Sequence, residues 1–442
     1  MRKSYINLGP LVHHLDKSDR QVFERVSRFF RGLDGRVKVT IAGTAIQNYG
    51  QQLTMQYTQL YASNLGADAV EIGFLNSITG AVNTIVSVPQ GWATERYTVK
   101  KIMLLGLACA ALSAAFSALA NDWWMLIPAF ILAGRLVMIM PLADIIFISI
   151  TNPQRRATIM SLARVIWDML GTFSPMAAAL VVASFGGINA QGIRPLYYIQ
   201  ILLATFVFLL VAVKLEPLSS EAERKTAESS SRKISFIQDF RELFEGEKWL
   251  KRWILLGAVR AFGMSLAMPF APLWMVDVKG ATPYILGLMG AASAIMSSFL
   301  QVPAGRLADR VGRKKVYFLL RPLAYLGTVL LIFAPSPEYL IVVGFLGSLA
   351  VGGGVSGGIG GVSFTPFITM HWEMVPKEKR GRWFGIEGLC MSASAIPATI
   401  LGGILWQHGL MREVLLLPLV LEALVVTPIL VTVPDTLTRP RQ

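Results

Sequence analysis

Long apolar stretches recur along the chain and constrain its fold more than any other feature. Of the 442 residues, 54% are hydrophobic and only 15% are charged, whereas soluble domains carry roughly 25% charged residues. A helix needs about 20 apolar residues to cross the hydrocarbon core of a bilayer. Twelve segments approach or exceed that length, so we predict an all-α membrane protein with twelve transmembrane helices. Their approximate ranges are 40–62, 70–91, 102–120, 123–150, 158–185, 196–213, 253–276, 284–305, 316–334, 339–369, 383–406 and 412–433.

The distribution of positive charge predicts the orientation of the chain in the membrane. With the N-terminus placed in the cytoplasm, 34 of the 41 lysines and arginines fall on the cytoplasmic side, three fall on the opposite side, and four lie inside predicted spans. Cytoplasmic loops of membrane proteins carry such an excess, so both termini are expected in the cytoplasm. We therefore attribute the net charge of +14 to topology, and binding to nucleic acid is not expected.

The segments between and beyond the spans have simpler signals. Residues 1–38 predict a cytoplasmic tail whose apolar residues, spaced among arginines, indicate a short amphipathic helix on the inner leaflet; a disordered basic tail is the alternative. Residues 216–249 are polar and predict a cytoplasmic linker, and residues 436–442 a short cytoplasmic tail. Cys109 and Cys390 have no metal-ligand spacing, so neither a metal nor a cofactor is expected.

The sequence also repeats itself. Residues 89–101 (PQGWATERYTVKK) align without a gap with residues 303–315 (PAGRLADRVGRKK) at an offset of 214. Further along, three prolines of the first half have counterparts in the second half at offsets of 222 to 225. This order predicts two pseudo-symmetric six-helix bundles, residues 39–215 and 250–435. Membrane proteins built from such repeats include secondary transporters, whose solute site lies near the bilayer midplane between the halves.

The segment GRLADRVGRKK (305–315) resembles the loop signature of the major facilitator superfamily, Gly-x-x-x-Asp-Arg-x-Gly-Arg-Lys/Arg, at six positions. The first-half copy departs from that signature, because Glu95 replaces the aspartate and Thr98 a glycine. A short turn between helices needs glycine for positive φ. The resemblance implies the twelve-helix fold of the family, with loops that latch the halves together in one of two states. The predicted latch residues are Gly305, Asp309, Arg310, Gly312 and Arg313, with Gly91, Glu95 and Arg96 in the first half.

Ionisable residues inside predicted spans are functional candidates, because each costs roughly 2.5–3.5 kcal/mol at the bilayer centre. Arg135 falls near the midplane, and Arg260 lies in the inner half of the seventh span. The resemblance assigns the first, fourth, seventh and tenth helices to the cavity, and the first span is too polar to face lipid. The predicted substrate-binding residues are Arg135, Arg260, Gln47, Gln51, Gln52, Gln56 and Tyr57. Alternatively, the two arginines pair with Asp144 or Glu387 as structural contacts.

Proton coupling requires a carboxylate whose proton affinity responds to burial and to a nearby cation. Asp168 and Glu387 meet this requirement, with Arg164 and Arg260 as candidate modulators. Since Arg164 and Asp168 are four residues apart, an internal ion pair is the alternative. By contrast, Arg321 and Glu422 lie in the ninth and twelfth spans, which the family packs side by side away from the cavity, and these two are expected to form a structural pair.

Two further segments bear on mechanism. GTFSPMAAA (171–179) partly matches the antiporter pattern of the family's drug exporters, with small residues that permit close helix packing. GGGVSGGIGG (352–361) has seven glycines in ten positions of the tenth span. This segment is expected either to be locally broken beside the solute or to pack tightly against a neighbouring helix.

These features predict a monomeric secondary active transporter that moves a small organic solute across the cell membrane by alternating access, coupled to a proton or another ion. The deep charges sum to one positive unit, which favours export of organic anions or amphiphilic compounds; uptake of a metabolite such as a carboxylate or sugar is the alternative. An enzyme is not expected. As a remote alternative, GVSGG matches the GxSxG pattern of a serine protease, with Ser356 as nucleophile and His371 or His408 as base.

Overall fold

The computed structural model describes residues 33–134, 139–151, 153–215, 248–349, 358–375 and 380–433. Within these ranges every regular element is a helix. The elements of the first half are α2 (Gly35–Met55), α3 (Thr58–Asn64), α4 (Ala69–Arg96), α5 (Val99–Leu119), η2 (Trp123–Leu126), α6 (Ile127–Ala133), α7 (Ile139–Ile150), α8 (Pro153–Ser184) and α9 (Ala190–Lys214). Those of the second half are α12 (Lys248–Ala267), α13 (Ala271–Leu273), η4 (Trp274–Val278), α14 (Pro283–Val311), α15 (Arg313–Phe333), α16 (Tyr339–Leu346), α17 (Gly358–Val362), α18 (Phe364–Met374), α19 (Arg380–Gln407), α20 (Met411–Leu421), η6 (Glu422–Val426) and α21 (Thr427–Thr432).

In the described part of the chain, nine helical segments are long and apolar enough to cross a membrane. They correspond to nine of the twelve predicted spans. The first predicted span is helical as α2 and α3, but its glutamines and asparagines make it too polar for this criterion. The fourth and tenth spans contain residues 135–138 and 350–357, which lie outside the described residues, and so does most of the predicted amphipathic tail.

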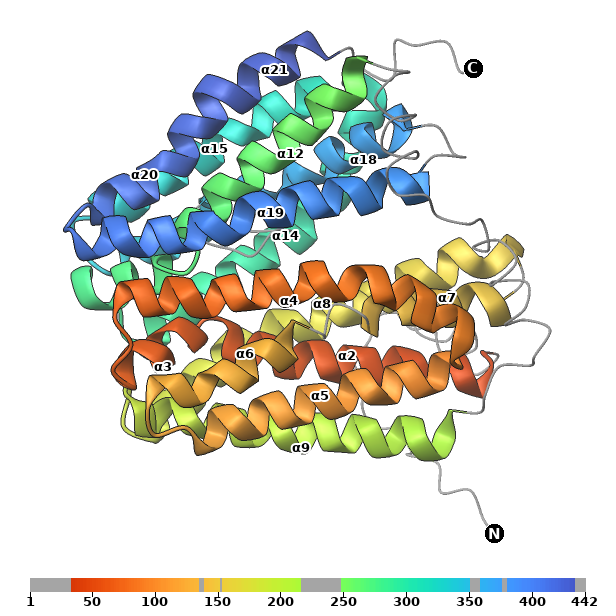
Figure 1. Cartoon of the computed structure of the whole chain (residues 1–442). Coiled ribbons are helices and arrows are strands. Elements are labelled where there is room, and N and C mark those ends of the chain that lie inside the picture. Colours follow the sequence, from red (N-terminus) through yellow and green to blue (C-terminus); the bar gives the residue numbers. More distant parts are fainter. Residues whose placement is uncertain are drawn as a thin grey trace, which may run out of the picture.

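The helices form two groups that follow the sequence repeat. Helices α2 to α9 lie together in one group and helices α12 to α21 in the other, with α4 next to α19 where the groups meet (Figure 1). Helix α8 contacts α14 at the same boundary. Among the described residues, the two groups therefore meet mainly through α4 with α19 and α8 with α14, and α3 makes a smaller contact with α13.

Among the described residues, the hydrophobic core is shared between the halves at one end of the molecule. The largest cluster of buried side chains includes Ile72 and Leu75 from the start of α4 together with Ala398 and Trp406 from the end of α19. At the opposite end three clusters are each confined to one half: one to residues 253–433, one to residues 99–215 and one to residues 37–167. The halves thus share one core where α4 begins and have separate cores where α4 ends.

Small residues let the backbones approach at the joined end. A Cβ atom at Gly73 would overlap the carbonyl oxygen of Thr399, and one at Gly403 would overlap the carbonyl oxygen of Ala69. Between α8 and α14, a Cβ at Gly287 would lie 2.6 Å from the Cβ of Ala179. The small residues predicted to allow close packing at 178 and 179 therefore lie where the halves touch.

Basic side chains bind the exposed carbonyl groups at helix ends. The Nζ atoms of Lys100 and Lys314, which occupy equivalent positions of the repeat, donate to Ala212 O and Val433 O, both at 2.8 Å. At the joined end, Lys279 donates to Ala334 O at 2.9 Å and Arg194 donates to Ala120 O at 2.5 Å. The last carbonyls of a helix lack intrahelical partners and carry partial negative charge, so these cations stabilise the helix ends.

Substitution of Gly403 by alanine should destabilise the joined state. The added methyl group has no space against Ala69, and overpacking of this kind costs about 1–3 kcal/mol. We expect spin labels at Asn64→Cys and His408→Cys, in a chain with Cys109 and Cys390 replaced by alanine, to show a larger population at longer distance. The matched control is Gly388→Ala on the same helix, where a Cβ meets nothing within 4 Å. Equal distance distributions in both variants would contradict the close contact.

Removal of the lysine that binds the end of α21 should lower stability. Lys314→Gln is expected to lower the melting temperature in detergent, because a carbonyl at the end of α21 loses a hydrogen bond to a charged donor, a loss of about 1.5–3 kcal/mol. Lys315→Gln, at the exposed neighbouring position, serves as the control and should leave the melting temperature within about 1 °C, as surface changes have small effects. The opposite ranking would exclude this role for Lys314.

Candidate functional site

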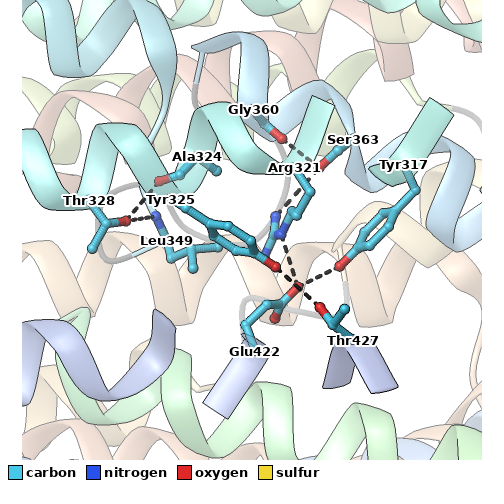
Figure 2. A network of polar contacts seen from close by, with 10 residues as sticks. All are labelled: Tyr317, Arg321, Ala324, Tyr325, Thr328, Leu349, Gly360, Ser363, Glu422 and Thr427. Atoms are coloured by element: carbon cyan, nitrogen blue, oxygen red, sulfur yellow. Dashed lines mark hydrogen bonds and ion pairs between the residues drawn. The ribbon is translucent and has the colours of Figure 1, made fainter. Parts of the chain in front are cut away.

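The second half contains a buried ion pair that the sequence predicts. Arg321 Nε lies 2.9 Å from Glu422 Oε1, and both side chains are about 5% exposed or less. Figure 2 shows that Tyr317, one turn before Arg321 on α15, donates its hydroxyl to the same carboxylate oxygen. Ser363 approaches Arg321 from the start of α18. The expectation that Arg321 and Glu422 pair is confirmed.

The surroundings of this pair explain why Glu422 can be buried. Glu422 begins η6, a π-helical turn between α20 and α21, and such turns re-aim side chains within a helix. On the other side of the turn, the Tyr325 hydroxyl lies 3.4 Å from Thr427 Oγ1 (Figure 2). A buried charge is tolerated when it is paired and hydrogen-bonded. The two hydrogen bonds to Glu422 Oε1 meet this condition.

Arg260 lies next to this pair, inside the second half. Its guanidinium stacks over the rings of Phe364 and Phe367 at 5.0 and 4.7 Å. The side chain is 9% exposed, and its Nε and Nη1 atoms make no hydrogen bond to the described residues. It borders a cavity of about 10 Å³ that Arg321 and Glu422 also line, which is room for about one water molecule. Two guanidinium groups thus face one carboxylate.

Glu387 lies away from Arg260 and beside a histidine. Its Oε2 atom is 3.5 Å from Nε2 of His371, and the residues are 8% and 2% exposed. The same Nε2 accepts a hydrogen bond of 2.8 Å from the indole of Trp383. Among the described side chains, no lysine or arginine lies within 4.0 Å of the Glu387 carboxyl group. The alternative in which Glu387 pairs with Arg260 is therefore not adopted in this structure.

The polar residues of the first span have different environments. Gln47 and Tyr57 are buried, Gln51 is exposed, and Gln52 is half-buried. Gln56 reaches the boundary between the halves, because its Nε2 atom would lie 2.5 Å from a Cβ placed at Gly290 of α14. The structure thus brings Gln56 next to the second half, whereas Tyr57 belongs to the shared core.

The remaining deep charges are separate. Arg164 and Asp168 are both exposed on α8, and no ion pair within 4.0 Å joins these two described residues, so the internal pair is not formed here. Asp144 is half-buried on α7. Arg135 lies outside the described residues. Whether Arg135 and Arg260 face one chamber therefore stays a prediction.

The loop signature of the second half makes contacts within its own half. Gly312 has φ of 119°, as expected for the turn between α14 and α15, whereas Gly305 lies inside α14 and is not a turn residue. Arg313 forms ion pairs with Asp309, at 3.6 Å, and with Glu373 at the end of α18. Arg310 lies in the last turn of α14. Among these described residues, no hydrogen bond or ion pair reaches the first half.

The first-half copy of the signature ends α4, and the side chains of Gly91, Glu95 and Arg96 lie outside the described part. A latch between the two halves therefore stays a prediction, for the second of the two states that the family resemblance implies. Ser356, the nucleophile of the protease alternative, also lies outside the described residues. Nε2 of His371 accepts a hydrogen bond from the Trp383 indole, and Nδ1 of His408 lies 2.8 Å from the carbonyl oxygen of Ile404 one turn earlier.

Comparisons with known proteins identify the family. The model of the Major Facilitator Superfamily matches residues 40–259 and 253–442, nearly the whole chain. The nucleoside transporter NupG has a similar structure, with a TM-score of 0.70 at 12% identity over 91% of this chain and 100% of that chain. The chain belongs to the Major Facilitator Superfamily. It is accordingly a multi-pass membrane protein of a transporter family and not an enzyme, as the sequence predicts.

Two curated relatives are named for drug resistance. The tetracycline resistance protein, class E, of Escherichia coli is 28% identical over 149 residues, which cover 33% of this chain and 34% of the relative. The multidrug resistance protein MdtG of Dickeya zeae is 25% identical over 310 residues, 66% of this chain and 71% of the relative. The first alignment thus spans about a third of the relative's length.

Breaking the buried pair from one side should strongly destabilise the protein. Arg321→Met leaves Glu422 buried without its cation, at a cost of about 3–5 kcal/mol, so we expect a large fall in melting temperature in detergent. Replacing both residues, in Arg321→Met with Glu422→Leu, should recover part of the loss, because the uncompensated carboxylate is removed while Arg260 keeps its contacts with Phe364 and Phe367. A double variant as unstable as the single one would contradict the pairing as the dominant contribution.

Proposed function

We propose that this protein is a secondary active transporter that exports organic anions or amphiphilic compounds by alternating access, in exchange for protons. The observation that carries this proposal is the shared core at one end of the halves and the separate cores at the other. Two packed bundles joined at only one end can exchange that contact for one at the opposite end. A solute site between them would then open to each side in turn.

The positive-inside rule indicates to which side of the membrane this state is open. The loops after α4 and α14, which carry the basic signature residues, lie at the end where the cores are separate. If that end faces the cytoplasm, as the 34 basic residues assigned there support, the state is open inward. The protein then lies in the cell membrane with both termini in the cytoplasm. It acts as a monomer.

Uncompensated positive charge supports a negatively charged solute. Arg260 is buried without a hydrogen bond to Nε or Nη1, beside a second guanidinium and a single carboxylate. The proposed solute contacts are Arg135, Arg260, Gln47, Gln51, Gln52, Gln56 and Tyr57. The cavity beside Arg260, about 10 Å³, is too small for an organic molecule, so Arg260 would engage solute only after α12 moves. The two relatives named for drug resistance support export.

Asp168 and Glu387 are the proposed proton carriers, with Arg164 as modulator of Asp168. Glu387 is 8% exposed and has no lysine or arginine within 4.0 Å among the described side chains. A buried carboxyl group without a cation is stable only when it is neutral or hydrogen-bonded. Glu387 is therefore suited to bind a proton in this state and to release it in another.

Uptake by proton symport is the second candidate, and the sign of the pH change separates the two. We expect proteoliposomes with an acidic lumen and a trapped pH dye to accumulate external taurocholate, an amphiphilic sulfonate, while the lumen becomes more alkaline. A symporter would instead acidify the lumen when the outer solution is acidic. Ethidium, an amphiphilic cation, tests the charge preference, and we expect it to be transported at least tenfold more slowly. Net accumulation of neither probe would refute the proposal of export.

Substitution of both acids tests the coupling. Asp168→Asn with Glu387→Gln should reduce gradient-driven accumulation of taurocholate at least tenfold, because the amides bind no proton. Exchange of taurocholate across the membrane without a gradient should persist. Glu413→Gln, at an exposed site at the start of α20, is the control and should behave as the unchanged protein. Undiminished accumulation in the double variant would exclude both acids as carriers.

A further inference from the structure

One nitrogen atom in the second half has two competing neighbours. Nε2 of His371 lies 2.8 Å from the indole nitrogen of Trp383 and 3.5 Å from Oε2 of Glu387. Trp383 and Glu387 are four residues apart on α19, so they share one face of that helix. The sequence indicates Glu387 as a proton carrier, but its pattern gives His371 no part in transport.

The chemistry of these groups fixes where the protons lie. An indole N–H only donates, so Nε2 of His371 accepts and carries no proton, which leaves a neutral ring with its proton on Nδ1. An ionised Glu387 would present an acceptor oxygen to this acceptor nitrogen. A protonated Glu387 removes that conflict. The contact between His371 and Glu387 is therefore not an ion pair in this state.

The ring of His371 is held in place by its neighbours. Trp253 of α12 stacks on it with ring centres 4.7 Å apart and 16° between the planes. Trp253 directs its own indole N–H to the sulfur of Met374. His371 and both tryptophans are at most 2% exposed. Of the two tryptophans that pack on the imidazole, Trp383 thus donates to Nε2, whereas Trp253 donates to Met374.

Among the described side chains, the other charged groups near this contact have partners elsewhere, and the side chains of Arg380 and Arg382 on α19 lie outside the described part. On α12, Gly257 packs against Oε1 of Glu387, and the next turn carries Arg260, which stacks on Phe364 and Phe367. Glu373 of α18 pairs with Arg313, and Glu422 pairs with Arg321. Cys390 lies one turn along α19 and is half-buried. The side chains at the end of α4 lie outside the described part.

We propose that Trp383 is a positioning residue for proton exchange, which holds His371 as a neutral acceptor while Glu387 keeps its proton. When α19 moves relative to α18, the Trp383 hydrogen bond breaks and Glu387 takes its place at Nε2. The proton then passes from Oε2 of Glu387 to Nε2 of His371: one O–H bond breaks, one N–H bond forms, and a carboxylate–imidazolium pair results. The reverse movement returns the proton to Glu387.

The same helix connects this exchange to the contact between the halves. Gly403 of α19 packs on the start of α4, and it lies 16 residues, or roughly 24 Å along the helix, from Glu387. Movement that separates the halves at Gly403 would displace both Trp383 and Glu387 at the other end. This inference rests on the proposed proton coupling and adds the residues that would link it to helix movement.

Infrared titration of the purified full-length protein tests the proposal without a solute. The carboxylic acid band that disappears in Glu387→Gln reports the proton on Glu387. In Trp383→Phe the ring remains but its N–H is lost, so His371 can pair with Glu387 at any time. We expect protonation of Glu387 in this variant to require about tenfold higher proton concentration, because a neighbouring cation favours the carboxylate. Trp253→Phe, which removes the other stacked indole, should leave the titration within about twofold.

Equal titrations of Trp383→Phe and Trp253→Phe would overturn the proposal. If Trp383→Phe cannot be purified, histidine ¹⁵N spectra of the unchanged protein decide, with the signal of His371 among the four histidines identified by its loss in His371→Gln. A proton on Nδ1 supports the proposal, and a proton on Nε2 overturns it. A shifted titration of Glu387 in Trp383→Phe, together with a lack of proton-driven transport by the unchanged protein, would support the role of Trp383 and refute the proposed proton coupling. Failure of the inference can therefore be distinguished from failure of the proposed function.

Discussion

The absence of water in the hydrocarbon core governs the rest of this structure. Backbone groups there must bond within the chain, so the spans are helices and only their ends need other partners. Basic side chains supply many of these partners. Lys100 and Lys314 do so at one end of the two halves, and Arg194 and Lys279 do so at the other. Two of the three basic residues that depart from the predicted charge bias thus have a local reason to be there.

The described contact between the halves depends on close packing of backbones. It consists of glycines against carbonyl groups and of small residues against one another, with the Ser77 hydroxyl donating to Ile396 O at 2.8 Å. Packing of this kind depends on close approach and not on buried charge. The buried ion pair, by contrast, lies within one half. Strong electrostatic contacts therefore hold a bundle together, while weaker ones hold the bundles to each other.

The sequence predicts the elements whose physics is local and repeated. Apolar length predicts the helices, and the offset of about 214 residues predicts the two groups. The family resemblance, which implies that the ninth and twelfth spans pack side by side, predicts the pair of Arg321 and Glu422. Gly312 is predicted by the positive φ that the turn requires. Gly305 belongs to the same signature but lies inside α14 with open space beside it, because a pattern of residue types cannot distinguish a turn from a position within a helix.

The site is harder to predict because it depends on rotation about helix axes. A one-residue difference in a helix turns a side chain by about 100°, which decides whether Arg260 faces a chamber or its own bundle. The structure directs it to Phe364 and Phe367. The pairing of His371 with Trp383 is not predicted for another reason: their hydrogen bond joins two helices, and nothing in the composition of either helix indicates it.

The π-helical turn at Glu422 ties these observations to one backbone irregularity. This turn, η6, holds one residue more than an ordinary helical turn, so α20 and α21 are rotated relative to the course of an unbroken helix. The carbonyl of Val433, at the end of α21, accepts a hydrogen bond from Lys314, and Glu422 forms an ion pair with Arg321. Deletion of a single residue within η6 would rotate one end of the last span relative to the other. Either the hydrogen bond from Lys314 to Val433 or the ion pair of Arg321 with Glu422 could then form, but not both.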